Sequence, residues 1–146
     1  MAADPVVVDA SIVVHAIVPG QRQEACMAQL GRLIEAGRLA APSLWLYEVT
    51  SSLSKLAHFG DLTDEEAERA LADSQDLGVE LFVPDLEGQK SALAWAQQLG
   101  RAAAYDGFYL SLARRLGCDL WTTDLRLVRA TDLPWVRAVR GLPTDG

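Results

Sequence analysis

The chain has 146 residues and a net charge of −7; 50% of its residues are hydrophobic and 23% are charged. This composition is typical of a globular protein with its own core and not of a disordered chain. No apolar run approaches the roughly 20 residues of a bilayer span, and we expect no secretory signal because Met1–Pro5 lack a basic start and a long apolar stretch. Cys26 and Cys118 lie too far apart for a disulfide framework or a zinc site, so we expect a soluble, cytoplasmic protein with one domain over residues 1–146.

The first half of the chain opens with the β-branched run Val6–Val8, which predicts a buried parallel strand ending at Asp9. A segment of mixed pattern from Ser11 to Val18 follows, and Pro19-Gly20 ends it. The apolar spacing then predicts a helix, a short strand and a second helix: about Gln21–Glu35, near Leu39–Ala40, and from a capping Ser43 through Leu56.

In the second half, Thr63 and Glu66 form a capping-box pattern that predicts the start of an acidic helix. Strands and helices then alternate: a strand at Val79–Val83, a helix at Leu86–Leu99 opened by a capping Asp85, a helix at Asp106–Leu116 ended by Gly117, a strand at Cys118–Thr122, a helical turn from Asp124 and a strand around Trp135–Val139. Strands separated by helices require crossover connections, which predicts an α/β fold with a mostly parallel central sheet and helices on both faces.

Four acidic residues lie where such a sheet would bind a ligand, beyond the carboxyl ends of its strands. Asp9 and Asp124 each follow a predicted strand, Asp106 begins a predicted helix, and Glu48 lies within the helix after Pro42. Clustered carboxylates raise one another's pKa unless a cation neutralises them. Mg²⁺ and Mn²⁺ favour oxygen ligands, so such a cluster suits metal-assisted phosphodiester hydrolysis.

Each acid taken alone also has a structural explanation. Asp9 and Asp124 can cap the helices that follow them, and Asp106 is favoured in a first turn by the helix dipole. Glu48 can be an exposed helical glutamate. The four acids alone therefore do not distinguish a structural role from a catalytic one. The sequence that surrounds them is more informative.

Four segments in chain order carry that surrounding sequence: Val6-Val7-Val8-Asp9-Ala10-Ser11, Pro42-Ser43-Leu44 through Glu48-Val49, Tyr105-Asp106-Gly107 through Ala113, and Leu120-Trp121-Thr122-Thr123-Asp124. Together they resemble the PIN-domain family, and within it the toxin ribonucleases of the VapC type. The last two segments are the more specific. Thr123 stands where many members have Asn, a departure that leaves Thr122 and Asp124 matched.

The resemblance implies a single PIN-like domain acting as a metal-dependent endoribonuclease, the toxin of a type II toxin–antitoxin module. It implies Mg²⁺ or Mn²⁺ as cofactor, RNA as substrate, a cognate antitoxin and a homodimer, with no membrane partner. It also assigns residues: Asp9, Glu48, Asp106 and Asp124 as metal-binding and catalytic acids, and Ser11 and Thr122 as hydroxyls that orient them or the substrate.

Two other families with an aspartate at a strand end fit less well. A phosphotransferase of the haloacid dehalogenase type expects a second aspartate where this chain has Ser11, and a response-regulator receiver expects paired early acids. Both expect a late lysine, and no lysine follows Lys90. The alternative that stays open is a PIN-like protein that binds RNA or a partner without cleaving, which metal-dependent turnover would distinguish.

Overall fold

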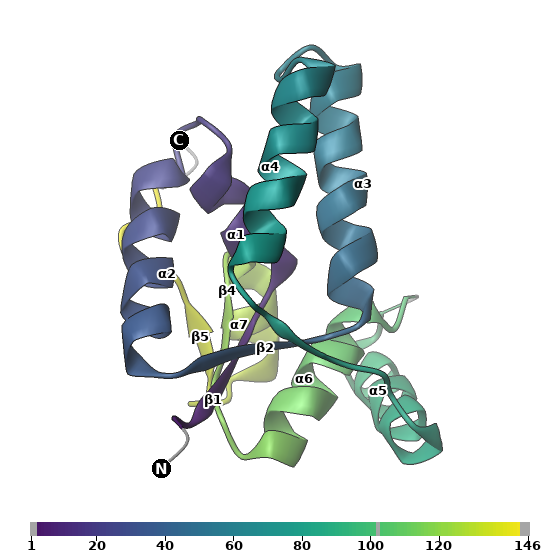
Figure 1. The fold of residues 1–146 in the computed structure, drawn as a ribbon. Helices are drawn as coiled ribbons and strands as arrows, with labels where there is room; N and C mark the ends of the chain where they lie inside the picture. Colours follow the sequence, from purple (N-terminus) through teal and green to yellow (C-terminus); the bar gives the residue numbers. More distant parts are fainter. Residues whose placement is uncertain (1–2, 102, 144–146) are drawn as a thin grey trace.

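The computed structural model describes residues 3–101 and 103–143. Within these residues, seven helices and five strands follow one another along the chain (Figure 1). In chain order they are β1 (Pro5–Val8), α1 (Ala10–Ile17), α2 (Gln23–Ala36), β2 (Arg38–Pro42), α3 (Leu44–His58), α4 (Asp64–Asp76), β3 (Glu80–Phe82), α5 (Leu86–Leu99), α6 (Tyr105–Leu116), β4 (Leu120–Thr122), α7 (Leu125–Thr131) and β5 (Val136–Ala138). No helix in this part of the chain has both the length and the apolarity needed to cross a bilayer.

The strands form one sheet in the order β3-β2-β1-β4-β5, and all four neighbouring pairs are parallel. β1 lies at the centre, where Val7 is opposite Ala40 of β2 on one side and Leu120 of β4 on the other. The chain extends the sheet outward from β1 to β3 and then returns to the far side of β1. The strand order therefore reverses between β1 and β4, which places a ligand-binding crevice at their carboxyl ends.

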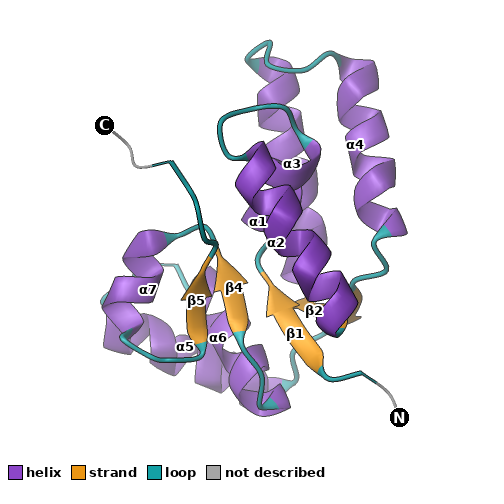
Figure 2. Cartoon of the chain, turned by 90° about the vertical axis from the view of Figure 1, so that its left-hand side faces the viewer, coloured by secondary structure: helices purple, strands orange, loops and turns teal. Residues whose placement is uncertain are grey.

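Helices cover both faces of the sheet, as predicted. Figure 2 shows α1 and α2 on one face and α5, α6 and α7 on the other, while α3 and α4 extend beyond the sheet and pack beside α1. Because both faces are covered, the central strand is apolar on both sides: Val7 and Val8 are fully buried. Leu110 from α6 and Ile12 from α1 fill the core from opposite sides.

Three of the predicted helix boundaries are confirmed in atomic detail. Thr63 and Glu66 form the capping box of α4, with hydrogen bonds in both directions. The Asp85 carboxylate accepts a hydrogen bond from the backbone N–H of Gly88, at 2.8 Å, and caps α5. Gly117 ends α6 in the left-handed conformation, with φ of 65°, which glycine adopts without steric cost.

One local prediction is wrong, and one segment that the sequence left unassigned is now defined. Ser43 does not cap α3 through its side chain, because its backbone is already helical (φ −56°, ψ −24°) and the hydroxyl does not reach a free N–H. A capping side chain requires an extended backbone at that position. The segment of mixed pattern from Ser11 to Val18, to which the sequence assigned no element, is largely α1. It is apolar on most sides because α2, α3, α4 and the sheet enclose it.

Candidate active site

Asp9 is the centre of the candidate site, at the carboxyl end of β1. One oxygen of its carboxylate, Oδ2, accepts hydrogen bonds from the Thr122 hydroxyl at 2.7 Å and from the Ser11 hydroxyl at 3.0 Å. Thr122 is the last residue of β4, so the parallel pairing of β1 with β4 brings these side chains together. The other oxygen, Oδ1, accepts no hydrogen bond from the side chains that the structure describes.

The two hydroxyls are themselves held in place. Thr123 donates to the Ser11 hydroxyl at 2.8 Å, and the backbone N–H of Asp124 donates to the Thr122 hydroxyl at 3.0 Å. Thr122 is fully buried. Fixed partners of this kind hold a carboxylate in one orientation.

Burial raises the pKa of Asp9 above its ordinary value, and the nearby Asp124 carboxylate raises it further. The hydrogen bonds from Thr122 and Ser11 oppose this shift because they stabilise the charged form. The carboxylate therefore lies in an environment where its negative charge is costly and where a nearby cation would be strongly favoured.

Asp106 reaches the same crevice from the first turn of α6. Burial raises its pKa, the carboxylates of Asp124 and Asp9 raise it as well, and Arg101 opposes the shift. The Arg101 guanidinium lies 3.3 Å from Oδ2 of Asp106, and both side chains are about one-third exposed. The acidic cluster thus includes one cation that its own chain supplies.

Glu48 completes the cluster from α3. Its Oε1 accepts a hydrogen bond of 2.6 Å from the hydroxyl of Tyr109, a residue one turn along α6 from Asp106. Burial raises the pKa of Glu48, and the charges of Asp9 and Asp106 add to that shift while Tyr109 opposes it. Glu48 is therefore not the exposed helical glutamate of the simplest structural explanation.

Asp124 plays a second role at the same time. It precedes α7, and its Oδ1 accepts hydrogen bonds from the backbone N–H groups of Arg126 and Leu127 at 3.0 and 3.1 Å. It therefore caps α7, as one structural explanation held, and its charge still acts on Asp9 and Asp106.

The structure places Asp9 and Asp106 on one small cavity, with Glu48 and Asp124 near enough for their charges to interact with these acids, but it does not assemble a finished metal site. A small cavity among the strand ends is lined by six residues: Asp9, Asp106, Tyr109, Leu120, Thr122 and Leu127. Among the described residues, no three side chains of the metal-binding types are arranged closely enough to hold an ion. The donor chemistry nevertheless fits a hard divalent cation, because the available donors are carboxylate oxygens whose charges repel one another.

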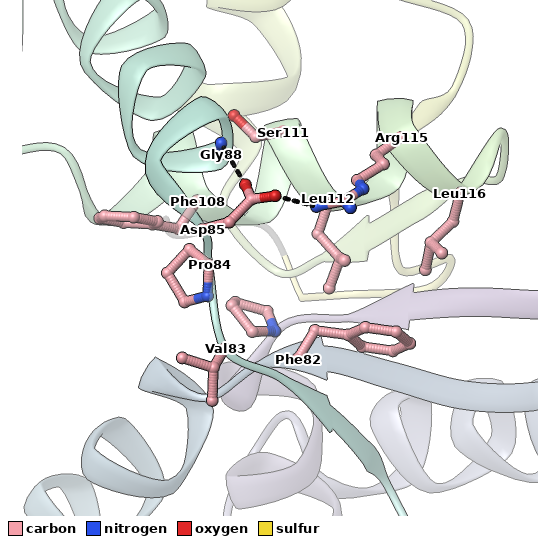
Figure 3. A pocket seen from close by; sticks show the side chains of 11 residues that line it. Phe82, Val83, Pro84, Asp85, Gly88, Phe108, Ser111, Leu112, Arg115 and Leu116 are labelled. Carbon is pink, nitrogen blue, oxygen red and sulfur yellow. Dashed lines mark hydrogen bonds and ion pairs between the residues drawn. The ribbon is translucent and has the colours of Figure 1, made fainter.

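A larger pocket, of about 250 Å³, lies on the other side of α6 and contains none of the four acids. Figure 3 shows its lining, in which the side chains of Phe82, Phe108 and Leu112 are accompanied by an ion pair of 3.4 Å between Asp85 and Arg115. The catalytic candidates are thus separate from this apolar pocket.

Arg101 and Tyr109 contact the predicted acids, and the sequence analysis assigned neither of them a role. Tyr109 lies three residues after Asp106, so the helical period places it on the same face of α6, a signal available in the sequence. Arg101 follows Gly100 in the loop before α6, and its pairing with Asp106 depends on how that loop turns. No sequence pattern marks it.

Comparisons with known proteins agree on one family. The sequence profile described as PIN domain matches residues 6–133. Ribonuclease VapC3 from Pyrobaculum aerophilum is 35% identical over 123 residues, which are 83% of this chain and 90% of that protein.

Two solved structures have the same fold. PAE2754 from Pyrobaculum aerophilum superposes with a TM-score of 0.70 at 24% identity, covering 95% of this chain and 86% of that one. VapC20 from Mycobacterium tuberculosis, described as a sarcin-ricin loop cleaving toxin, superposes with a TM-score of 0.64 at 16% identity, covering 90% and 98%. At these identities the superpositions show a shared fold.

Proposed function

The chain belongs to the PIN domain family, and on this premise we propose that it is a divalent-metal-dependent endoribonuclease that serves as the toxin of a toxin–antitoxin pair. One observation carries the proposal: Asp9 and Asp106 line one small cavity at the strand ends, and burial together with the charge of other acids of the four raises the pKa of Asp9, Glu48 and Asp106. The relative named a ribonuclease, which spans most of both chains, supports the reaction class.

The proposed roles follow from the geometry of each side chain. Asp9 and Asp106 would hold the cation, Asp9 through Oδ1, to which no described side chain donates, and Asp106 by exchanging its contact with Arg101. Glu48 and Asp124 would complete the acidic site directly or through water. Ser11 and Thr122 orient the Asp9 carboxylate through the hydrogen bonds already described. When bound, a divalent cation lowers the pKa of water and stabilises charge that develops at phosphorus.

An antitoxin is the partner that this function requires, because a free ribonuclease would damage the RNA of its own cell. The acidic crevice offers a target for an arginine of such a partner, since the guanidinium fork matches carboxylates in a bidentate way. Arg101 already pairs with Asp106 within the chain, through one nitrogen and one oxygen at 3.3 Å. The homodimer implied by the resemblance stays a prediction, to be checked by sedimentation.

Cleavage of structured RNA with and without Mg²⁺ or Mn²⁺ tests the proposal. We expect cleavage that EDTA abolishes and added cation restores, and its loss in the Asp9→Asn variant. Asp61→Asn is the matched control, because Asp61 is an exposed loop aspartate outside the crevice. A protein that binds RNA in the presence of Mg²⁺ and Mn²⁺ but never cleaves it would instead establish the non-catalytic alternative.

A further inference from the structure

A groove on the surface of α3 continues outward from the acidic crevice. It has a volume of about 500 Å³ and is lined by Leu44, Tyr47, Glu48, Ser51, Ser52, Lys55 and Tyr105. Glu48 belongs both to this groove and to the acid cluster, where Tyr109 of α6 binds it. In Figure 1 the first turn of α3 lies beside the segment that leads into α6. Whatever occupies the groove therefore lies next to the candidate catalytic carboxylates.

We propose that this groove, hereafter the α3 groove, binds unpaired nucleotides of the RNA on one side of the scissile phosphate. Tyr47 and Tyr105 stack on bases, and Lys55 contacts a backbone phosphate. This inference rests on the proposed function, and it assigns the side chains of this chain that contact the RNA beside the cleavage site.

The lining residues of α3 follow one another along the helix axis, from Glu48 at the acid cluster to Lys55. Glu48, Ser52 and Lys55 are separated by four and three residues, so they lie on one face of the helix. Seven residues of helix span about 10 Å, which matches about three stacked nucleotides at about 3.4 Å each. The serine hydroxyls lie between the acidic end and the basic end, where they can donate hydrogen bonds to backbone oxygens.

The two tyrosines are exposed although they are large aromatic residues. Tyr47 is 72% exposed and Tyr105 is 58% exposed, whereas Tyr109, which serves the acid cluster, is only 3% exposed. The two come from different elements, α3 and the start of α6, and line the same groove. Exposed aromatic faces beside a cationic side chain are what proteins use to bind single-stranded nucleic acid.

Lys55 is one of only two lysines in a chain of net charge −7. It is exposed and makes no ion pair with the residues that the structure describes, in contrast to Lys90, which pairs with Glu87. A phosphate is the counter-ion that an RNA backbone would bring to it.

Nucleic acid fits the α3 groove better than a protein surface does. The central part of a protein interface is enriched in tyrosine but depleted in lysine, glutamate and serine, and four of the seven residues of this lining are of the depleted types. A duplex does not fit, because bases already stacked in a helix are not available to tyrosine rings. Unpaired RNA has the bases and the phosphates that this lining can contact.

The test measures binding in a protein that cannot cleave. In the Asp9→Asn background with Mg²⁺, fluorescence anisotropy would follow labelled oligouridylate and oligoadenylate of about six nucleotides. We expect Tyr47→Ala, Tyr105→Ala and Lys55→Ala each to raise the Kd about 10-fold, Tyr47→Phe to retain binding, and a duplex of the same length to bind more weakly than the single strand.

Matched controls separate the groove from general surface effects. Phe59→Ala removes an aromatic that is 76% exposed at the other end of α3, and Lys90→Ala removes the second lysine. Both should leave the Kd unchanged, and thermal melting confirms that every variant is folded.

The outcomes distinguish this inference from the proposed function. If the native chain cleaves RNA while Tyr47→Ala and Tyr105→Ala bind single strands as their parent does, the groove inference is wrong and the function stands. If single strands bind through the tyrosines but no RNA is cleaved, the function is wrong and the groove stands. Tyrosine substitutions that disrupt a dimer or an antitoxin complex without changing the RNA Kd would overturn the groove inference in favour of a protein-binding surface.

Discussion

Asp9 and Asp85 occupy similar positions between a strand and a helix, but the fold shifts the pKa values of their carboxyl groups in opposite directions. Each follows a strand and stands at the N-cap of the next helix, with an extended backbone. Asp85 uses its carboxylate to cap α5, pairs with Arg115, and has a pKa held below its ordinary value chiefly by the Gly88 N–H. Asp9 makes no capping hydrogen bond to α1, and burial raises its pKa.

The difference shows which property separates a structural acid from a candidate catalytic one. A carboxylate that caps a helix is stabilised in its charged form and needs no ligand. A carboxylate that is buried beside other acids is destabilised in its charged form, which makes a cation favourable. Strand-end position is common to both, so it is the environment created by the strand-order reversal that gives Asp9 its character.

The largest expected effect is on activity, and it tests the contrast between Asp9 and Asp85. We expect Asp9→Asn to lower kcat/KM for RNA cleavage more than about 100-fold, because even partners that merely support a ligand cost about 10–100-fold when removed. Asp85→Asn should leave cleavage unchanged, since asparagine also caps helices well. Steady-state kinetics on one RNA measure both variants. Equal losses in the two would mean that strand-end position alone determines the role.

The next effect concerns the hydroxyl that holds Asp9. We expect Thr122→Val to lower activity about 10–100-fold, because valine keeps the shape of threonine but cannot donate to Oδ2 of Asp9. Thr131→Val is the matched control: Thr131 donates only to backbone carbonyls of its own helix, α7. Turnover should fall in the first variant and persist in the second. A fully active Thr122→Val enzyme would remove the orienting role.

Much of the fold was predictable because its signals are local. The apolar run Val6–Val8, the capping box at Thr63 and the glycine after α6 each specify a boundary within a few residues, and all are confirmed. The cap assigned to Ser43 was wrong because capping depends on backbone angles, which the neighbouring strand β3 fixes here: the Ser43 N–H is bound by the carbonyl of Phe82.

The four acids could be identified from the sequence, but their hydrogen bonds and their effects on one another's pKa could not be predicted from it. That Asp124 both caps α7 and acts on Asp106 depends on the packing of α6 against the sheet. The pairing of Arg101 with Asp106 and the α3 groove both depend on the tertiary structure. In the groove, Tyr47 and Tyr105 come together although they are 58 positions apart in the sequence. No periodicity within either segment could have paired them.

A smaller effect is expected on the free energy of unfolding, where a bound cation should again distinguish Asp9 from Asp85. A cation that binds only the folded acid cluster should stabilise the protein by about 2.7 kcal/mol at one hundred times its dissociation constant. Urea unfolding with increasing Mg²⁺ or Mn²⁺ measures this gain. We expect Asp9→Asn to reduce it and Asp85→Asn to leave it intact. A gain that is the same in both variants would place the stabilising cation elsewhere on the protein.

The smallest effect is the pH dependence of the metal-free protein, where the two aspartates should act in opposite directions. The pKa of Asp9 is raised from 3.8 in the fold, so its contribution to stability is fully present below 3.8 and is lost as pH rises through the folded pKa. Asp85 has a lowered pKa, so its contribution is present above 3.8 and is lost as pH falls through the folded value.

In EDTA, Asp9→Asn should therefore lose less stability than the native chain as pH rises from about 4 toward neutrality, with a slope difference of at most about 1.4 kcal/mol per pH unit for one proton. Asp85→Asn should instead flatten the loss of stability on acidification below pH 4. Urea midpoints across the pH range measure both effects. If Asp9→Asn instead reduces the loss of stability on acidification below pH 4, the native Asp9 carboxylate is stabilised in its charged form, as that of Asp85 is. The contrast between the two aspartates would then disappear.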